Sequence, residues 1–317
     1  MKAYILKRLL WAIPTLLGSV TIVFILMNIL PGDIAQILLA SESGRIDPQQ
    51  YEILRQQLGL NLPLWQQYWN WLSGLFRGDF GVSLWTGRPV LGEIVHRLPY
   101  TGSLVILSVA LTIITAIPIG IISAIYQDKW PDYVLRVLVI GGIAIPNFWF
   151  GLMALLFLVL AFRYHAPLGY ATLWTDPLAA IQQLALPAFT LGFRSAASSA
   201  RMMRSSMLEV LREDYIRTAR SKGLTERAVV YIHGLRNAIL PVVTMFGMQI
   251  AFLFSGTVII ETVFNIPGIG LLILDAINHR DIILVEGCVV FMVIVVLVTN
   301  LLTDLVYGWI DPRIRYS

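Results

Sequence analysis

The chain has 317 residues, of which 57% are hydrophobic and only 13% are charged, and its formal net charge is +4. Soluble domains carry about 25% charged residues, so this composition excludes an ordinary water-soluble protein and indicates one that crosses a membrane several times. The small positive charge follows from the membrane topology argued below and does not indicate a nucleic-acid partner.

Apolar runs near the length that crosses a hydrocarbon core, about 20 residues, recur along the chain. They are Leu9–Leu30, Leu104–Tyr126, Val137–Phe162, Leu184–Ala200, Ile239–Ile260 and Ile282–Leu302. The first run is too long for the apolar part of a cleaved secretory signal, so we interpret it as a retained anchor. The sequence therefore predicts an all-α integral membrane protein with six transmembrane helices.

Residues 31–97 lie between the first and second runs and are too many for an unstructured loop. Within this segment, Asp47 and Pro48 match a helix start, and the later stretch "PLWQQYWNWLSGLF" has the aromatic density of a membrane–water boundary. We expect short amphipathic helices on the outer surface, either as a cap over the spans or as a docking surface. The chain is thereby divided into segments 1–30, 31–97 and 98–317.

Lysine and arginine are distributed unevenly between the two sides of these runs. Most of the 23 lie at the two termini and in the segments after the second and fourth runs. Because cytoplasmic loops carry the excess of these residues, the sequence predicts that both termini are cytoplasmic.

A few polar side chains fall within the runs and are candidates for a translocation pathway. Arg194 lies inside the fourth run, where a central charge costs roughly 2.5–3.5 kcal/mol on insertion scales. Either it lines a watery pathway, or it sits near a lipid headgroup or a carboxylate of a partner chain. Asn147 and Gln249 belong to a set of polar and helix-breaking residues that suits a moving pathway, with ordinary helix packing as the alternative for each.

Several kinds of chemistry lack the residues that they require. No lysine follows a glycine, so the phosphate-binding loop G-x-x-x-x-G-K-[ST] is absent. The scattered histidines and the single Cys288 form no metal-binding pattern, and we expect Cys288 to be a small buried residue. Glu261, Glu286 and Asp304 lie at run ends, where we expect water to solvate them. We therefore predict no catalytic residue, metal or cofactor in this chain, and an ion-driven transporter and an intramembrane enzyme are the disfavoured alternatives.

The segment between the fourth and fifth runs is basic and contains one glycine, Gly223. Met207–Lys222 has a helical pattern, and Gly223 supplies the left-handed residue that ends a helix. Thr225 can cap a second helix that continues past Pro241 into the fifth run. The result is a helix–glycine–helix elbow on the cytoplasmic face, suited to be gripped by a cytoplasmic protein.

The elbow resembles the coupling loop, or EAA loop, of bacterial ABC-importer permeases, whose short helix fits a cleft in the ATP-binding subunit. Counting back from Gly223, the E-A-A triplet of that motif falls on Arg217, Thr218 and Ala219, so the match departs at its first two positions. These departures, together with "GDFGVSL", "RSSMLEVL", "ETVFNIPGIG" and "NLLTDLVYGWIDPRIRY", are similar to the dipeptide, oligopeptide and nickel importers over almost the whole chain. The long outer segment is similar to the first of the two paired permeases.

The resemblance implies a type I importer permease fold and a multi-pass protein of the bacterial inner membrane that carries peptides or a related small solute. Its coupling loop would span 205–241, with ATPase contacts at Arg217, Thr218, Ala219, Arg220, Lys222, Gly223 and Leu224. It implies a second homologous permease, two ATP-binding subunits that hold ATP and Mg, an extracytoplasmic substrate-binding protein and surrounding lipid. For each basic residue, a solvated surface contact is the alternative to a specific ion pair.

Overall fold

The computed structural model describes residues 2–29, 48–57, 60–165, 167 and 169–310. Regular structure within these ranges is helical, apart from one isolated bridge between Val82 and Pro89. The elements are α1 (Lys2–Ile29), α3 (Pro48–Gln57), α4 (Leu64–Phe76), α5 (Val90–Ile125), α6 (Trp130–Ala144), α7 (Asn147–Phe162), α8 (Pro177–Val210), α9 (Asp214–Ser221), α10 (Glu226–Ala228), the π-helical turn η1 (Val229–Gly234), α11 (Leu235–Phe264), α12 (Ile269–Asn278) and α13 (Ile282–Ile310).

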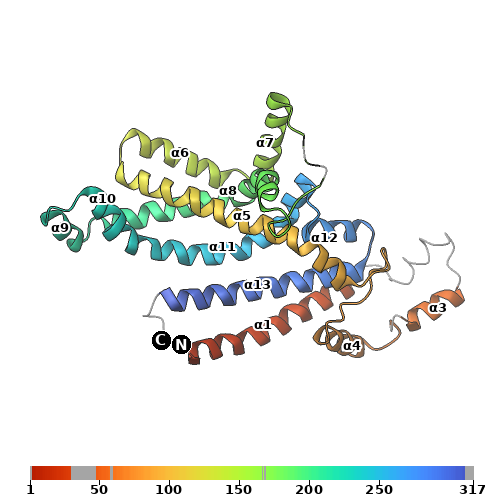
Figure 1. Ribbon diagram of the computed structural model, residues 1–317. Helices are drawn as coiled ribbons and strands as arrows, with labels where there is room; N and C mark the ends of the chain where they lie inside the picture. The colour runs from red at the N-terminus through yellow and green to blue at the C-terminus, as the bar shows by residue number, and fades with distance from the viewer. Residues whose placement is uncertain (1, 30–47, 58–59, 166, 168, 311–317) are drawn as a thin grey trace.

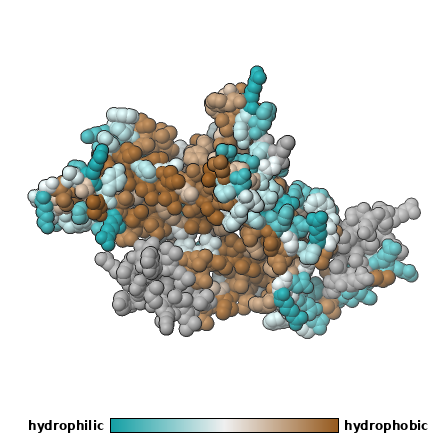
Figure 2. Space-filling model, in the orientation of Figure 1, coloured by the Kyte–Doolittle hydropathy of each residue, from teal (hydrophilic) through white to brown (hydrophobic). Residues whose placement is uncertain are grey.

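The long helices form an elongated bundle (Figure 1). The start of α1, the end of α13 and the short helices α9 and α10 lie at one end of the bundle, whereas α3, α4 and α12 lie at the other. Figure 2 shows hydrophobic side chains over the middle of the bundle and hydrophilic ones over α9 and α10. This arrangement matches a chain whose middle lies in lipid and whose two ends meet water.

Helices α5, α8 and α11 form the centre of the bundle. One buried cluster unites Leu104, Leu184, Leu191, Leu253 and Ile260 from these three helices. Small side chains bring α5 and α8 close together: the Ser108 hydroxyl donates to the Ala188 carbonyl at 2.8 Å, and a Cβ added at Gly192 would lie 2.6 Å from Thr112 Oγ1. Close approach through small residues is how helices associate in lipid.

The expected number of membrane spans is not confirmed. Within the described ranges, three helical segments are long and apolar enough to cross a membrane, namely α5, the run 226–264 and 282–303, or four if α6 and α7 count as one bent span. The first predicted run appears as the shorter apolar stretch Leu10–Leu26. The fourth, Leu184–Ala200, lies inside the longer α8, which serine and arginine residues make less apolar.

The third predicted run, Val137–Phe162, is not one continuous helix. Helices α6 and α7 meet there at a bend of 110°. Pro146 has no N–H to donate and disfavours a helical conformation at the preceding residue, and Ile145 accordingly adopts φ −82° and ψ 128°. The bend places Asn147 at the start of α7.

Helices α3 and α4 lie where the sequence predicts short helices in the outer segment, although Asp47, the expected cap of the first, lies outside the described residues. Helix α4 packs against α1, where the Tyr68 and Thr21 hydroxyls are hydrogen-bonded at 2.7 Å. On α4, Trp65 and Trp69 are exposed, as expected for aromatic side chains at a membrane–water boundary. The boundaries of the three sequence segments stay predictions.

The expectation that water solvates Glu261 is wrong. Its side chain is fully buried and accepts hydrogen bonds from the Thr101 hydroxyl at 2.6 Å and from the Leu271 N–H at 3.1 Å. The chain wraps closely around it, since a Cβ at Gly268 or Gly270 would lie 2.3 or 2.9 Å from the carboxyl group. The glycines of the "NIPGIG" bend therefore make room for a buried carboxyl group.

The other residues singled out near the sixth run differ from one another. Cys288 is fully buried beside Val90 and Leu284, as the sequence predicts. Glu286 is half-buried, and the side chain of Asp304 lies outside those that the structure describes, so its solvation stays a prediction.

Replacing Thr101 by valine should destabilise the end of the bundle where α12 packs against α5. The Thr101 hydroxyl donates to Glu261 and accepts from the Ile269 N–H at 2.9 Å, so valine leaves two buried polar groups without this partner, each worth about 1–3 kcal/mol. Thr101→Ser keeps the hydroxyl and serves as the control. We expect equilibrium unfolding in mixed micelles to separate the two variants, and equal stabilities would contradict this role.

Candidate functional site

The elbow between α8 and α11 confirms the predicted turn chemistry. Gly223 has φ +79°, and its N–H donates to the Arg220 carbonyl at 2.9 Å. The Thr225 hydroxyl then accepts from the Ala228 N–H and begins the run that continues through η1 into α11. Glycine tolerates the left-handed conformation without steric cost, which explains why the chain reverses here.

The prediction of a single helix over Met207–Lys222 is wrong. Helix α8 ends at Val210, and α9 begins at Asp214 after Glu213 takes an extended conformation with φ −67° and ψ 150°. Asp214 in the first turn of α9 favours this new start, because a carboxylate stabilises the N-terminal end of a helix. The interruption turns a different face of the short helix toward the protein.

Helix α9 rests on a small apolar seat. Ile216 and Ala219 are buried against Val229, with Leu211 packed at the edge. Tyr215, the residue before Ile216, is 40% exposed. Of the predicted coupling residues, Ala219 is buried, whereas Arg217, Thr218, Arg220, Lys222, Gly223 and Leu224 are exposed.

The exposed surface of the elbow is basic but partly neutralised. Arg220 Nε lies 2.8 Å from Glu226 Oε1 across the glycine turn, and Arg217 contacts Asp214 at 3.3 Å. Exposed pairs of this kind contribute about 0–1 kcal/mol, so they do not prevent either arginine from meeting another carboxylate. Lys222 forms no ion pair with the described residues. The elbow thus has exposed cations on its surface.

Arg194, Asn147 and Gln249, which come from three different predicted runs, line one cavity between α7, α8 and α11. Its volume is about 350 Å³, and Ser198 and Phe252 also form its wall. The amide of Asn147 donates to the Leu191 carbonyl at 3.2 Å, and Gln249 Oε1 accepts from the Ser199 hydroxyl at 3.0 Å. Arg194 is exposed. The structure therefore brings the three candidates together.

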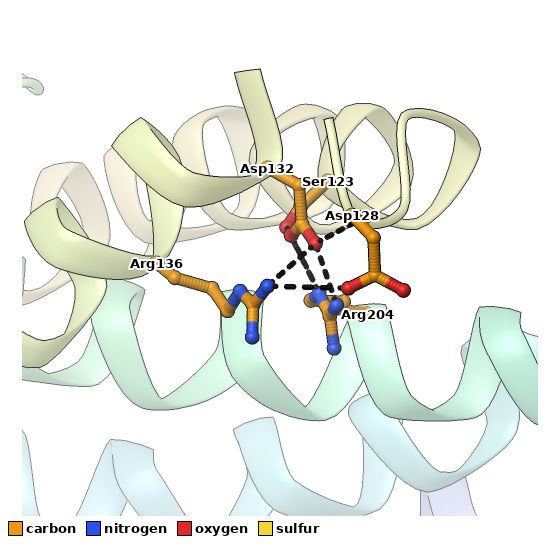
Figure 3. Close-up of polar contacts among 5 residues, drawn as sticks. All are labelled: Ser123, Asp128, Asp132, Arg136 and Arg204. Carbon is orange, nitrogen blue, oxygen red and sulfur yellow. Dashed lines mark hydrogen bonds and ion pairs between the residues drawn. The ribbon is translucent and has the colours of Figure 1, made fainter. Parts of the chain in front are cut away.

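A polar cluster that the sequence analysis missed joins α5, α6 and α8 near the elbow (Figure 3). Asp132 is fully buried, and Arg204 donates to its two carboxylate oxygens, from Nε and Nη2, at 2.8 Å each. Ser123 donates to the same carboxylate, while Arg136 lies 3.2 Å from Asp132 and 3.4 Å from Asp128. The i, i+4 spacing of Asp132 and Arg136 was a signal for part of this cluster, but Arg204 lies 72 residues away.

Comparison with known proteins identifies similarity along almost the whole chain. The family model described as "Binding-protein-dependent transport system inner membrane component" matches residues 116–316, and the model of its N-terminal part matches residues 1–105. The glutathione transport system permease protein GsiC of Escherichia coli strain K12 is 40% identical over 314 residues, 99% of each chain. The protein of the same name from Shigella flexneri serotype 5b is 41% identical over 315 residues, again 99% of each.

Proposed function

This chain belongs to the family of binding-protein-dependent transport system inner membrane components, and we propose that its elbow is the part that ATP-binding subunits grip. It is a permease component of an importer of this class, located in the inner membrane, and not an enzyme. Membership implies that ATPase and substrate-binding proteins work with it. The stoichiometry of the importer is part of the proposal: this chain would assemble with a second homologous permease and two ATP-binding subunits.

One observation carries the coupling role: α8 and α11 flank the elbow and also wall the cavity that contains Arg194 and Gln249. A force applied to α9 is therefore transmitted along two continuous helices to that cavity. The apolar seat of Ile216 and Ala219 holds α9 to the bundle, so that the short helix moves with the long ones. The exposed cations of α9 suit an acidic cleft.

In the proposed mechanism, ATP binding closes the two ATPases and draws the elbows of the two permeases together. The cavity then opens outward to accept solute from the binding protein, and hydrolysis returns it to the inward-open form. The chain would cross the membrane six times, through α1, α5, the bent pair α6–α7, α8, α11 and α13, with both termini and the elbow in the cytoplasm. In Figure 1 the start of α1, the end of α13 and the elbow helix α9 lie at the same end of the bundle, which supports this orientation.

The solute is proposed to belong to the peptide class, because the relatives are named for glutathione, a tripeptide. Arg194, Asn147 and Gln249 would line the pathway for this solute, as their common cavity supports. Much of the selection would take place in the binding protein before the solute reaches this chain.

Cysteine cross-linking tests the proposed docking of the elbow. Thr218→Cys places a thiol on the exposed side of α9, and we expect a short bifunctional reagent to join it to an ATP-binding subunit in the assembled importer. Arg77→Cys, exposed at the opposite end of the bundle, is the matched control and should form no such product. The native Cys288 is buried and should stay silent. Absence of a product from Thr218→Cys, or an equal product from Arg77→Cys, would refute the docking.

A further inference from the structure

Arg194 is an uncompensated cation in its cavity. It is exposed, it forms no ion pair with the residues that the structure describes, and none of the residues lining the cavity is acidic. Ten positions farther along the same helix, Arg204 is held by the buried Asp132. Of these two arginines of α8, Arg204 thus has a carboxylate partner from α6, whereas Arg194 has none among the described residues.

The groups around Arg194 are suited to bind an anion. A guanidinium presents a planar set of N–H donors that matches a carboxylate. Gln249 uses its Oε1 to accept from Ser199, which leaves its amide N–H groups as further donors at the wall, and Ser198 adds a hydroxyl. Asn147 adds one acceptor, its buried Oδ1, which has no hydrogen-bond partner among the described residues. Leu191, Phe252 and Leu253 form the apolar part of the lining, where an ion pair is screened less than in open water.

We propose that this cavity is an anion-selective subsite of the translocation pathway, in which Arg194 holds a carboxylate of the solute during passage. The inference rests on the proposed function, because it assumes that solute traverses the cavity. A volume of about 350 Å³ is in the range of small-molecule sites and fits a short peptide or one end of a longer one. The pathway itself then favours solutes with a free carboxylate, in addition to any selection by the binding protein.

The charge preference can be measured without knowing the natural solute. Ser198→Cys places a thiol in the cavity one helical turn from Arg194. In the complete importer in lipid nanodiscs, this thiol is reacted with a methanethiosulfonate reagent carrying either a sulfonate or a trimethylammonium group. The ratio of the two rate constants, anionic over cationic, is normalised to the ratio for a free thiol in solution. We expect a normalised ratio of about ten or more at low ionic strength, because one cation about 6 Å away attracts one reagent and repels the other.

Arg194→Gln, added to Ser198→Cys, should bring the normalised ratio to about one, and Arg194→Lys should retain most of it. Arg77→Gln makes the same charge change at the end of α4, outside the cavity, and should leave the ratio unchanged. High salt should lower the ratio in the Ser198→Cys protein that retains Arg194, which keeps the test decisive should Arg194→Gln fail to assemble.

Two outcomes separate the failure of this inference from failure of the proposed function. A ratio near one that neither Arg194→Gln nor salt alters, as expected if a lipid phosphate occupies Arg194, would overturn the anion site and leave the pathway standing. Protection of Ser198→Cys from both reagents in every nucleotide state would show that the cavity is not on a watery route, which would overturn both.

Discussion

Ala219→Glu should abolish transport while the importer still assembles. Ala219 is 7% exposed in the seat formed with Ile216 and Val229, and burial of an unpaired carboxylate there would cost several kcal/mol. We therefore expect α9 to leave its seat, so that ATPase movement no longer reaches α8. The measurement is ATP hydrolysis by the reconstituted importer with and without binding protein, and its stimulation should fall at least about tenfold, as when one coupling contact worth 1.4 kcal/mol or more is lost.

Ser221→Glu is the matched control for this variant. It adds the same charge to α9 at an exposed position and should leave α9 on its seat, so a loss of stimulation that both variants share is the effect of negative charge at the docking surface, and the additional loss in Ala219→Glu is the effect of the seat. Hydrogen exchange of the α9 amides should increase in Ala219→Glu alone, because only there does the charge fall inside the seat. Full stimulation despite faster exchange would show that the seat of α9 is not needed for coupling.

The elbow illustrates what local sequence signals can predict. Gly223 and Thr225 act through their own backbone conformation and side chain, so their roles could be read from residue type and spacing. The break at 211–213 could not, because no proline or glycine marks it and its residues are compatible with a helix. It accompanies the docking of Ile216 and Ala219 against Val229, a contact between two segments that a helical pattern does not contain.

The polar residues in the apolar runs show the same difference between local signals, which the sequence contains, and contacts between distant segments, which it does not. Hydropathy assigns a cost to Glu261 but cannot reveal the Thr101 hydroxyl, 160 positions away in the chain, that satisfies it. Arg194, Asn147 and Gln249 could be chosen as candidates because each is polar in an apolar run. That they share one cavity depends on which helices are neighbours, and periodicity alone does not determine this.

The prediction with the largest effect on stability concerns Arg204. Its bidentate pair with the buried Asp132 ties α8 to the start of α6, close to the end of the bundle where the elbow lies (Figure 1). Arg204→Leu leaves that carboxylate with Ser123, a backbone N–H and the partly exposed Arg136. Loss of one partner of a buried pair is strongly destabilising, and because Arg136 remains we expect about 2–4 kcal/mol by equilibrium unfolding in mixed micelles.

A double variant distinguishes whether the loss of stability comes from the unpaired Asp132 carboxylate or from the loss of the Arg204 side chain itself. Asp132→Leu combined with Arg204→Leu removes both charges, and such apolar replacement of a buried pair is often neutral or stabilising. It should therefore recover most of the stability that Arg204→Leu loses. Arg201→Leu, at an exposed position on the same helix, should have little effect. If Arg204→Leu and Arg201→Leu lost equal stability, or if the double variant were worse than Arg204→Leu, Asp132 would not be the group that makes Arg204 necessary. Recovery would mean that the buried carboxylate of Asp132 is what requires Arg204, and that this ion pair fixes α8 to α6. Any movement transmitted from the elbow along α8 must then either preserve this ion pair or break it.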